Sequence, residues 1–155
     1  MTTKPVWTSD KRYSQIESRI QESYPNACIL YIDEVLNDAL YQRYLTRKDL
    51  IKATEVHMFH GTNEKNITPI ITNGFDPKFN VRAAYGPGVY FAKNADYSRA
   101  YMFSAKKGEP TYMFLADVLV GKEGVDNHRG PDILTTVYAD GSFPRYIIAF
   151  HKEAK

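Results

Sequence analysis

The sequence predicts an α+β fold in which an antiparallel sheet dominates the second half of the chain. Apolar residues recur at helical spacing in the first half, and short apolar, β-branched runs dominate after residue 88. The expected order is helix, strand, helix, strand, helix and then mostly strands, which is typical of an α+β domain with helices grouped toward the N-terminal half. We expect residues 1–8 to be a loose lead-in and residues 9–155 to form a single domain.

Composition and charge restrict the function classes. The net charge of +2 is too small to indicate a nucleic-acid partner. The single cysteine, Cys28, excludes an internal disulfide, fits a reducing compartment and is expected to pack in the core. The start of the chain shows no secretory signal, and no apolar run approaches the roughly 18 to 20 residues of a membrane span. We therefore expect an intracellular protein, cytoplasmic or nuclear, with no membrane contact.

The first half of the chain carries three helix patterns and two strand patterns. Ser9 or Asp10 can cap a helix that runs to about Tyr24, and residues 35–53 show a second helical pattern. A short helix is expected over residues 66–72, with Asn66 as its cap and Gly74 as its stop. The strands are expected at residues 28–32 and 55–59, and strict alternation places His60 on the face of Val56 and Met58 at the end of the second strand.

The second half begins with a loop at residues 75–87, which holds two prolines and no clear period. A strand is expected at residues 88–92, and a helix capped by Asn94 is expected over residues 94–105. Further strands are expected at 111–121, 133–138 and 145–151, with a loop at 122–132 and a turn at 139–144.

Four features could carry chemistry. His60-Gly61-Thr62 follows a strand, and a glycine there lets a ligand approach the backbone closely. Gly86-Pro87-Gly88 precedes the strand Val89–Ala92. Ser98 and Tyr101 share one face of a helix, and the twelve tyrosines and eight phenylalanines offer surfaces for a flat ring. Each feature alone has a structural reading, since a lone histidine at a strand end is most often structural.

A metal site is not predicted. His57 and His60 are three residues apart, which on a strand points them to opposite faces, and the remaining histidines have no ligand cluster near them in sequence. The chain also lacks the nucleophile motif of hydrolases and the phosphate-binding loop of nucleotide triphosphatases.

In order and spacing, the motifs together are more specific than any one of them. The segments "HGT", "NGFD" (Asn73–Asp76), "YGPGVYFA", "YSRAY" and "FPRYIIAF" resemble the catalytic domain of poly(ADP-ribose) polymerase-like, or diphtheria-toxin-like, ADP-ribosyltransferases. The resemblance runs from about Val56 to His151. It implies a split antiparallel β-sheet of the ADP-ribosyltransferase type whose crevice binds NAD, which is the substrate; no metal is implied.

The resemblance also implies roles for individual residues. His60 would bind a ribose hydroxyl, the backbone of Gly61 and the hydroxyl of Ser98 would bind the carboxamide, and Tyr90 and Tyr101 would enclose the nicotinamide ring. The full implied cofactor-binding set is His60, Gly61, Thr62, Tyr90, Phe91, Ala92, Ser98 and Tyr101. A stacking tyrosine suits a flat cationic ring, and backbone and serine groups suit an amide.

The third catalytic position is where the chain departs from polymer-forming members, which carry a glutamate there. A gap-free alignment of residues 131–150 with mono-ADP-ribosylating members places Ile133 at this position, so the implied catalytic set is His60, Tyr90 and Ile133. A shorter alignment places Arg145 there instead. We prefer Ile133, because the longer register also accounts for the terminal strand. Neither residue is a glutamate, so the resemblance implies a glycosyltransferase that adds one ADP-ribose unit rather than a polymer.

Other readings stay open at this stage. The acceptor is expected to be a protein, including the chain itself; a nucleic-acid acceptor is neither supported nor excluded by the net charge. The main alternative is a catalytically inactive module of the same fold that binds NAD, ADP-ribose or RNA. An RNA 2′-phosphotransferase ranks lower, because no cluster of basic residues for a phosphate is visible. The sequence does not specify an oligomeric state.

Overall fold

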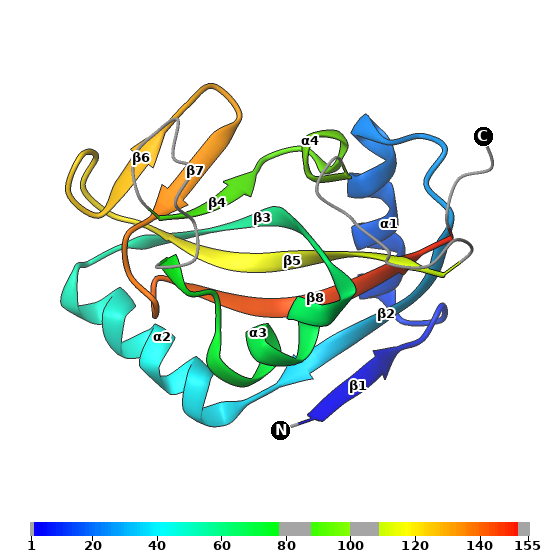
Figure 1. Cartoon of the computed structure of the whole chain (residues 1–155), viewed down its shortest axis with the longest axis horizontal. Helices are drawn as coiled ribbons and strands as arrows, with labels where there is room; N and C mark the ends of the chain where they lie inside the picture. Colours follow the sequence, from blue (N-terminus) through cyan, green and yellow to red (C-terminus); the bar gives the residue numbers. More distant parts are fainter. Residues whose placement is uncertain (1, 78–87, 100–108, 152–155) are drawn as a thin grey trace.

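The computed structural model describes residues 2–77, 88–99 and 109–151 and confirms an α+β architecture built on an antiparallel sheet (Figure 1). The strands within those ranges are β1 (Thr2–Val6), β2 (Ile29–Leu36), β3 (Thr54–Thr62), β4 (Val89–Ala92), β5 (Thr111–Val120), β6 (Asn127–Arg129), β7 (Ile133–Thr136) and β8 (Ser142–Phe150). They form one sheet in the order β1-β2-β8-β5-β3-β4-β7-β6, and every neighbouring pair is antiparallel.

The helices are grouped toward the N-terminal half, as predicted. They are α1 (Lys11–Ser23), α2 (Asp38–Leu50), the 3-10 turn η1 (Glu64–Asn66), α3 (Ile67–Asn73) and α4 (Ala95–Arg99). Asp10 caps α1 by accepting a hydrogen bond from the Arg12 amide at 2.9 Å, and Gly74 ends α3 with a φ of 80°. None of these helices has both the length and the apolar character that crossing a membrane demands.

The sheet is more extensive than the sequence pattern predicted. Residues 2–6, expected to be a loose lead-in, form β1 and pair with β2. β2 runs on to Leu36, so α2 begins only at Asp38, where Asn37 caps it by accepting from the Leu40 amide. β3 continues through His60 to Thr62, because each of its residues has a partner on β5. Strand pairing between distant segments therefore decides these boundaries.

Four smaller expectations were also wrong. The segment 122–132, expected to be a loop, contains the short strand β6, and β8 begins at Ser142 inside the expected turn. Asn66 makes no side-chain capping bond, whereas Asn63 caps η1. Cys28 is exposed rather than packed in the core.

The two faces of the sheet are covered by different helices. On one face, α1 packs Ile16, Ile20 and Tyr24 against sheet residues that include Phe59 of β3. On the other face, Ile67, Ile70 and Ile71 of α3 pack against a cluster that contains Met58 of β3. The alternation along β3 therefore holds, and it turns His60 toward the face that Met58 shares.

The sheet divides between β3 and β4. β3 pairs with β5 over all nine of its residues, from Thr54↔Val120 to Thr62↔Tyr112. In the described residues its register with β4 consists of the single pair Phe59↔Ala92. A five-stranded part, β1-β2-β8-β5-β3, and a three-stranded part, β4-β7-β6, thus meet at one residue pair. This is the split sheet that the sequence motifs implied.

Gly88 directly precedes β4 and allows a test of how closely the backbone is packed in the three-stranded part of the sheet. It has a φ of 144°, and a Cβ there would lie 2.6 Å from the carbonyl oxygen of Thr136. We expect Gly88→Ala to lower the free energy of unfolding by about 3 kcal/mol, since backbone strain and a clash with backbone add together. Gly124→Ala is the matched control, because Gly124 has a φ of 80° but no atom within 4 Å of its Cβ position. Its expected cost is about 1 kcal/mol. Urea unfolding of both variants measures the difference, and equal losses would contradict this account.

Candidate active site

His60 lies on β3 beside the split, and its imidazole ring bonds across to β4. The Nδ1 atom is 2.9 Å from the carbonyl oxygen of Tyr90. A carbonyl oxygen only accepts, so Nδ1 carries the proton and donates it. Burial lowers the pKa of His60 below its usual value, more than the hydrogen bond to Tyr90 raises it. The ring is therefore neutral at neutral pH, and its Nε2 atom is an acceptor.

Two phenylalanines fix the plane of the His60 ring. The Phe75 ring meets it edge-on, with centroids 4.8 Å apart, and the Phe91 ring lies 5.6 Å away. Phe75 and Phe91 also contact each other at 5.1 Å, and both are almost fully buried. Phe91 was predicted to bind the cofactor, but its side chain lies in the core and holds His60. Phe75 was expected only to begin the loop at residues 75–87 and was given no role of its own; its place directly after Gly74, the end of α3, was the available signal.

Most of the other predicted residues gather around the same split. Gly61 and Thr62 follow His60 in β3, and Tyr90 and Ala92 belong to β4. Ser98 is buried on α4, a helix that packs against β3, β4 and α1. The buried Thr62 hydroxyl donates to the carbonyl of Asn63 at 3.3 Å. Tyr101 lies outside the described residues.

The two candidates for the third position lie in different places. Ile133 begins β7, is buried, and pairs with Ala92, which itself pairs with Phe59. Phe59, Ala92 and Ile133 thus form one row across the split, and His60 adjoins the first of them. Arg145 lies on β8, which β5 separates from β3, and its Nη2 is 2.7 Å from Asp117. Its guanidinium also covers the Tyr41 ring at 4.7 Å.

A polar network occupies the part of β3 that precedes the site. His57 Nδ1 is 2.8 Å from Asp117, whose side chain is only 3% exposed and also binds Arg145. Glu55, on the same strand, accepts a hydrogen bond from the hydroxyl of Tyr44 at 2.7 Å. Glu55, His57 and Asp117 place one potential ligand atom each within 4.8 Å of one another. Because Arg145 and Tyr44 already use their oxygens, we interpret this group as an electrostatic link between β3, β5, β8 and α2.

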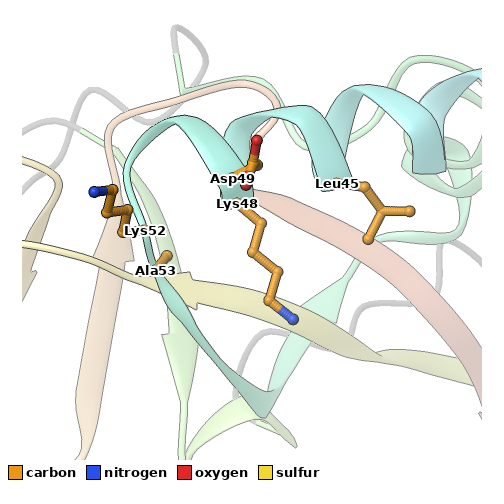
Figure 2. A pocket seen from close by; sticks show the side chains of 5 residues that line it. All are labelled: Leu45, Lys48, Asp49, Lys52 and Ala53. Atoms are coloured by element: carbon orange, nitrogen blue, oxygen red, sulfur yellow. The ribbon is translucent and has the colours of Figure 1, made fainter.

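A shallow hollow lies at the end of α2. It is lined by Leu45, Lys48, Asp49, Lys52 and Ala53 (Figure 2). The side chains of Lys48 and Lys52 extend in different directions and do not converge on one point. None of the predicted site residues lines this hollow, so it is not the candidate active site.

The split antiparallel sheet with helices on both faces is the fold of an ADP-ribosyltransferase catalytic domain. The model of the poly(ADP-ribose) polymerase catalytic domain family matches residues 10–134, so the chain belongs to that family. The resemblance inferred from the motifs is thereby confirmed.

Three curated relatives are similar to most of the chain. The human protein mono-ADP-ribosyltransferase PARP14 is 24% identical over 177 residues, which cover 93% of this chain and 10% of that protein. The human protein mono-ADP-ribosyltransferase PARP11 is 24% identical over 197 residues, covering 95% of this chain and 58% of that protein. The mouse protein mono-ADP-ribosyltransferase PARP10 is 34% identical over 105 residues, covering 62% and 11%. The chain thus spans less than two thirds of the length of each.

The polar network makes the stability of the protein depend on pH. The hydrogen bond to Asp117 raises the pKa of His57 in the folded state. The hydrogen bond between His57 and Asp117 therefore stabilises the fold fully below about pH 6.5, the usual pKa of histidine. This stabilisation is lost as pH rises through the raised pKa of His57. We expect the urea midpoint of the wild-type protein to fall as the pH rises above about 6.5. His57→Gln should remove that component, and identical pH profiles for the two proteins would contradict the assignment.

Proposed function

We propose that this chain transfers one ADP-ribose unit from NAD to a protein acceptor and releases nicotinamide. The observation that carries the proposal is the state of His60 at the split: its Nδ1 proton is held by Tyr90, so its neutral Nε2 can accept from a ribose hydroxyl. Membership of the catalytic-domain family and the mono-ADP-ribosyltransferase names of the relatives support the same activity.

In this proposal the residues around the split bind the nicotinamide half of NAD. Gly61 has no Cβ, so the carboxamide can reach its backbone N–H and C=O groups. The hydroxyl of Ser98 on α4 makes a further hydrogen bond to the carboxamide, and the Tyr90 side chain covers one side of the nicotinamide ring. Tyr101 is proposed to complete this enclosure.

The proposed reaction depends on a fixed geometry of the substrate more than on proton transfer. The bond between nicotinamide and ribose C1′ breaks with its electron pair leaving on the nicotinamide nitrogen, which turns the cationic ring into a neutral leaving group. A nucleophilic oxygen or nitrogen of the acceptor then bonds to C1′, and any proton that it carries passes to solvent. His60, held by Phe75 and Phe91, fixes the ribose in the reactive orientation.

The apolar third position favours a single transfer. Ile133 is buried in the row beside the split, and its side chain can neither accept a proton nor orient a hydroxyl group. Growth of a chain requires activation of a ribose hydroxyl on the ADP-ribose already attached. The proposed acceptor instead brings its own nucleophile, for which an ionised carboxylate is the simplest choice because it needs no base.

Transfer from labelled NAD tests the activity. Wild-type protein should give a sharp labelled band on a denaturing gel together with free nicotinamide. His60→Ala removes the ribose acceptor and should slow nicotinamide release by about a hundredfold. Gly61→Trp fills the space beside the backbone and should abolish it. An absence of label and of nicotinamide, with NAD or ADP-ribose still bound, would overturn the proposal in favour of a binding module.

A substitution at the third position tests why the product is a single unit. Ile133→Glu should not give long polymers, because the acceptor site must also fit a growing chain. We expect a sharp band to remain, at reduced intensity, since the glutamate side chain is placed in a buried position. Ile133→Gln, of the same size but uncharged, is the control that separates charge from shape. A high-mass smear from Ile133→Glu alone would show that the missing carboxylate is the whole explanation.

A further inference from the structure

Arg19 reaches from α1 to both strands that border the split. Its Nη2 atom donates hydrogen bonds to the carbonyl oxygen of His57 in β3 and to that of Lys93, which directly follows β4, at 3.3 Å for the latter. The guanidinium carbon lies 4.8 Å from the centroid of the Phe59 ring. One side chain of α1 therefore bonds to the backbone on each side of the split.

These hydrogen bonds lie where the next residue pair between β3 and β4 would be. Phe59 pairs with Ala92, and the same antiparallel register would set Met58 against Lys93. No such pair is present among the described residues, and Arg19 takes its place. On the other side of the Phe59–Ala92 pair, the His60 ring bonds to the Tyr90 carbonyl. Among the described residues, three successive contacts therefore link β3 to β4: the bonds from Arg19, the Phe59–Ala92 pair and the bond from His60.

The Arg19 side chain is half-buried where it bonds to the two carbonyl oxygens. Burial lowers the pKa of Arg19, which is the larger effect, while Glu22 on the same helix raises it. A guanidinium that has lost part of its water gains more from each remaining hydrogen bond than an exposed one. Its planar fork can also serve two acceptors from one position while its face lies on Phe59. The side chain is therefore held in a fixed position at the split.

We propose that Arg19 is a positioning residue that sets the separation of β3 and β4 and through it the orientation of His60 toward NAD. The role rests on the proposed function. Arg19 packs on Phe59, whereas His60 packs on Phe75 and Phe91, so the two side chains lie on opposite faces of β3. Arg19 thus acts through the strands and does not touch the substrate.

Loss of Arg19 removes one of the three described links between β3 and β4. The Tyr90 carbonyl can then shift relative to Nδ1 of His60, which weakens the bond that fixes the imidazole. A small displacement of a group that orients a substrate has a large effect on the rate of the reaction. The rate of nicotinamide release should therefore suffer more than the affinity for NAD, because every group that contacts NAD is still present and only the orientation of His60 changes.

The test compares Arg19→Gln and Arg19→Lys with the wild-type protein in the NAD assay. Arg19→Gln should lower kcat about tenfold, less than the loss expected when His60 itself is removed, with KM for NAD changed much less. Arg19→Lys keeps the charge, and its kcat should fall between those of Arg19→Gln and the wild type. The matched control is Arg12→Gln, because Arg12 lies on the same helix but binds Asp10 and Glu34. Its kcat should equal that of the wild type.

A second readout needs no activity. In the protein without NAD, the Nδ1 proton of His60 should give a protected imidazole NMR signal that is broadened or lost in Arg19→Gln and kept in Arg12→Gln. An unchanged signal and an unchanged kcat in Arg19→Gln would overturn the proposal, as would equal changes in Arg19→Gln and Arg12→Gln. If the wild-type protein failed to use NAD, the proposed function would fail, and the His60 signal would still decide the role of Arg19.

Discussion

In the part of the chain that the structure describes, β3 pairs with β4 at Phe59 and Ala92 alone, and the site depends on this constraint. β3 is anchored on its other edge, where β5 pairs with it from end to end, and helices pack on both of its faces. β4 is anchored separately, through four residue pairs with β7. Each strand is therefore held by its own part of the sheet, and one core cluster that contains Met58 of β3 and Phe91 of β4 packs across the split. A rigid frame on both sides of the split is what a site that works by positioning requires.

The two histidines of β3 show how one strand separates structural from chemical roles. His57 and His60 are three residues apart and so face opposite ways. Asp117 raises the pKa of His57, which belongs to the network that links the strands and α2, whereas burial lowers the pKa of His60. One ring therefore favours the charged state and the other the neutral state, although only two residues lie between them. The opposite shifts follow from environment alone, since both have the same ordinary pKa.

Local signals in the sequence were enough for the helices and for the positions of the motifs. Asp10 and Gly74 marked helix ends correctly because a cap is a bond within a few residues. β1 and β6 were missed because short strands exist only through their partners, as the pairing of β1 with β2 shows. Arg19 was missed for the same reason: its acceptors lie 38 and 74 residues away. Phe75 was visible within a motif, but its contact with His60 depends on where α3 ends.

The third position illustrates how register can inform an alignment. Sequence alone left Ile133 and Arg145 as alternatives, because the two alignments differ only in which segment is matched. The pairing of Ile133 with Ala92 places Ile133 in the row that crosses the split. Arg145 lies on β8, two strands away from β3, and is bonded to Asp117 on β5. A charged group already neutralised in a network cannot also serve a substrate without breaking that network. None of the three side chains of this row, those of Phe59, Ala92 and Ile133, is a carboxylate. The proposed chemistry then depends on how exactly the sheet holds His60, and the contacts that hold it matter as much as the residues that would touch NAD.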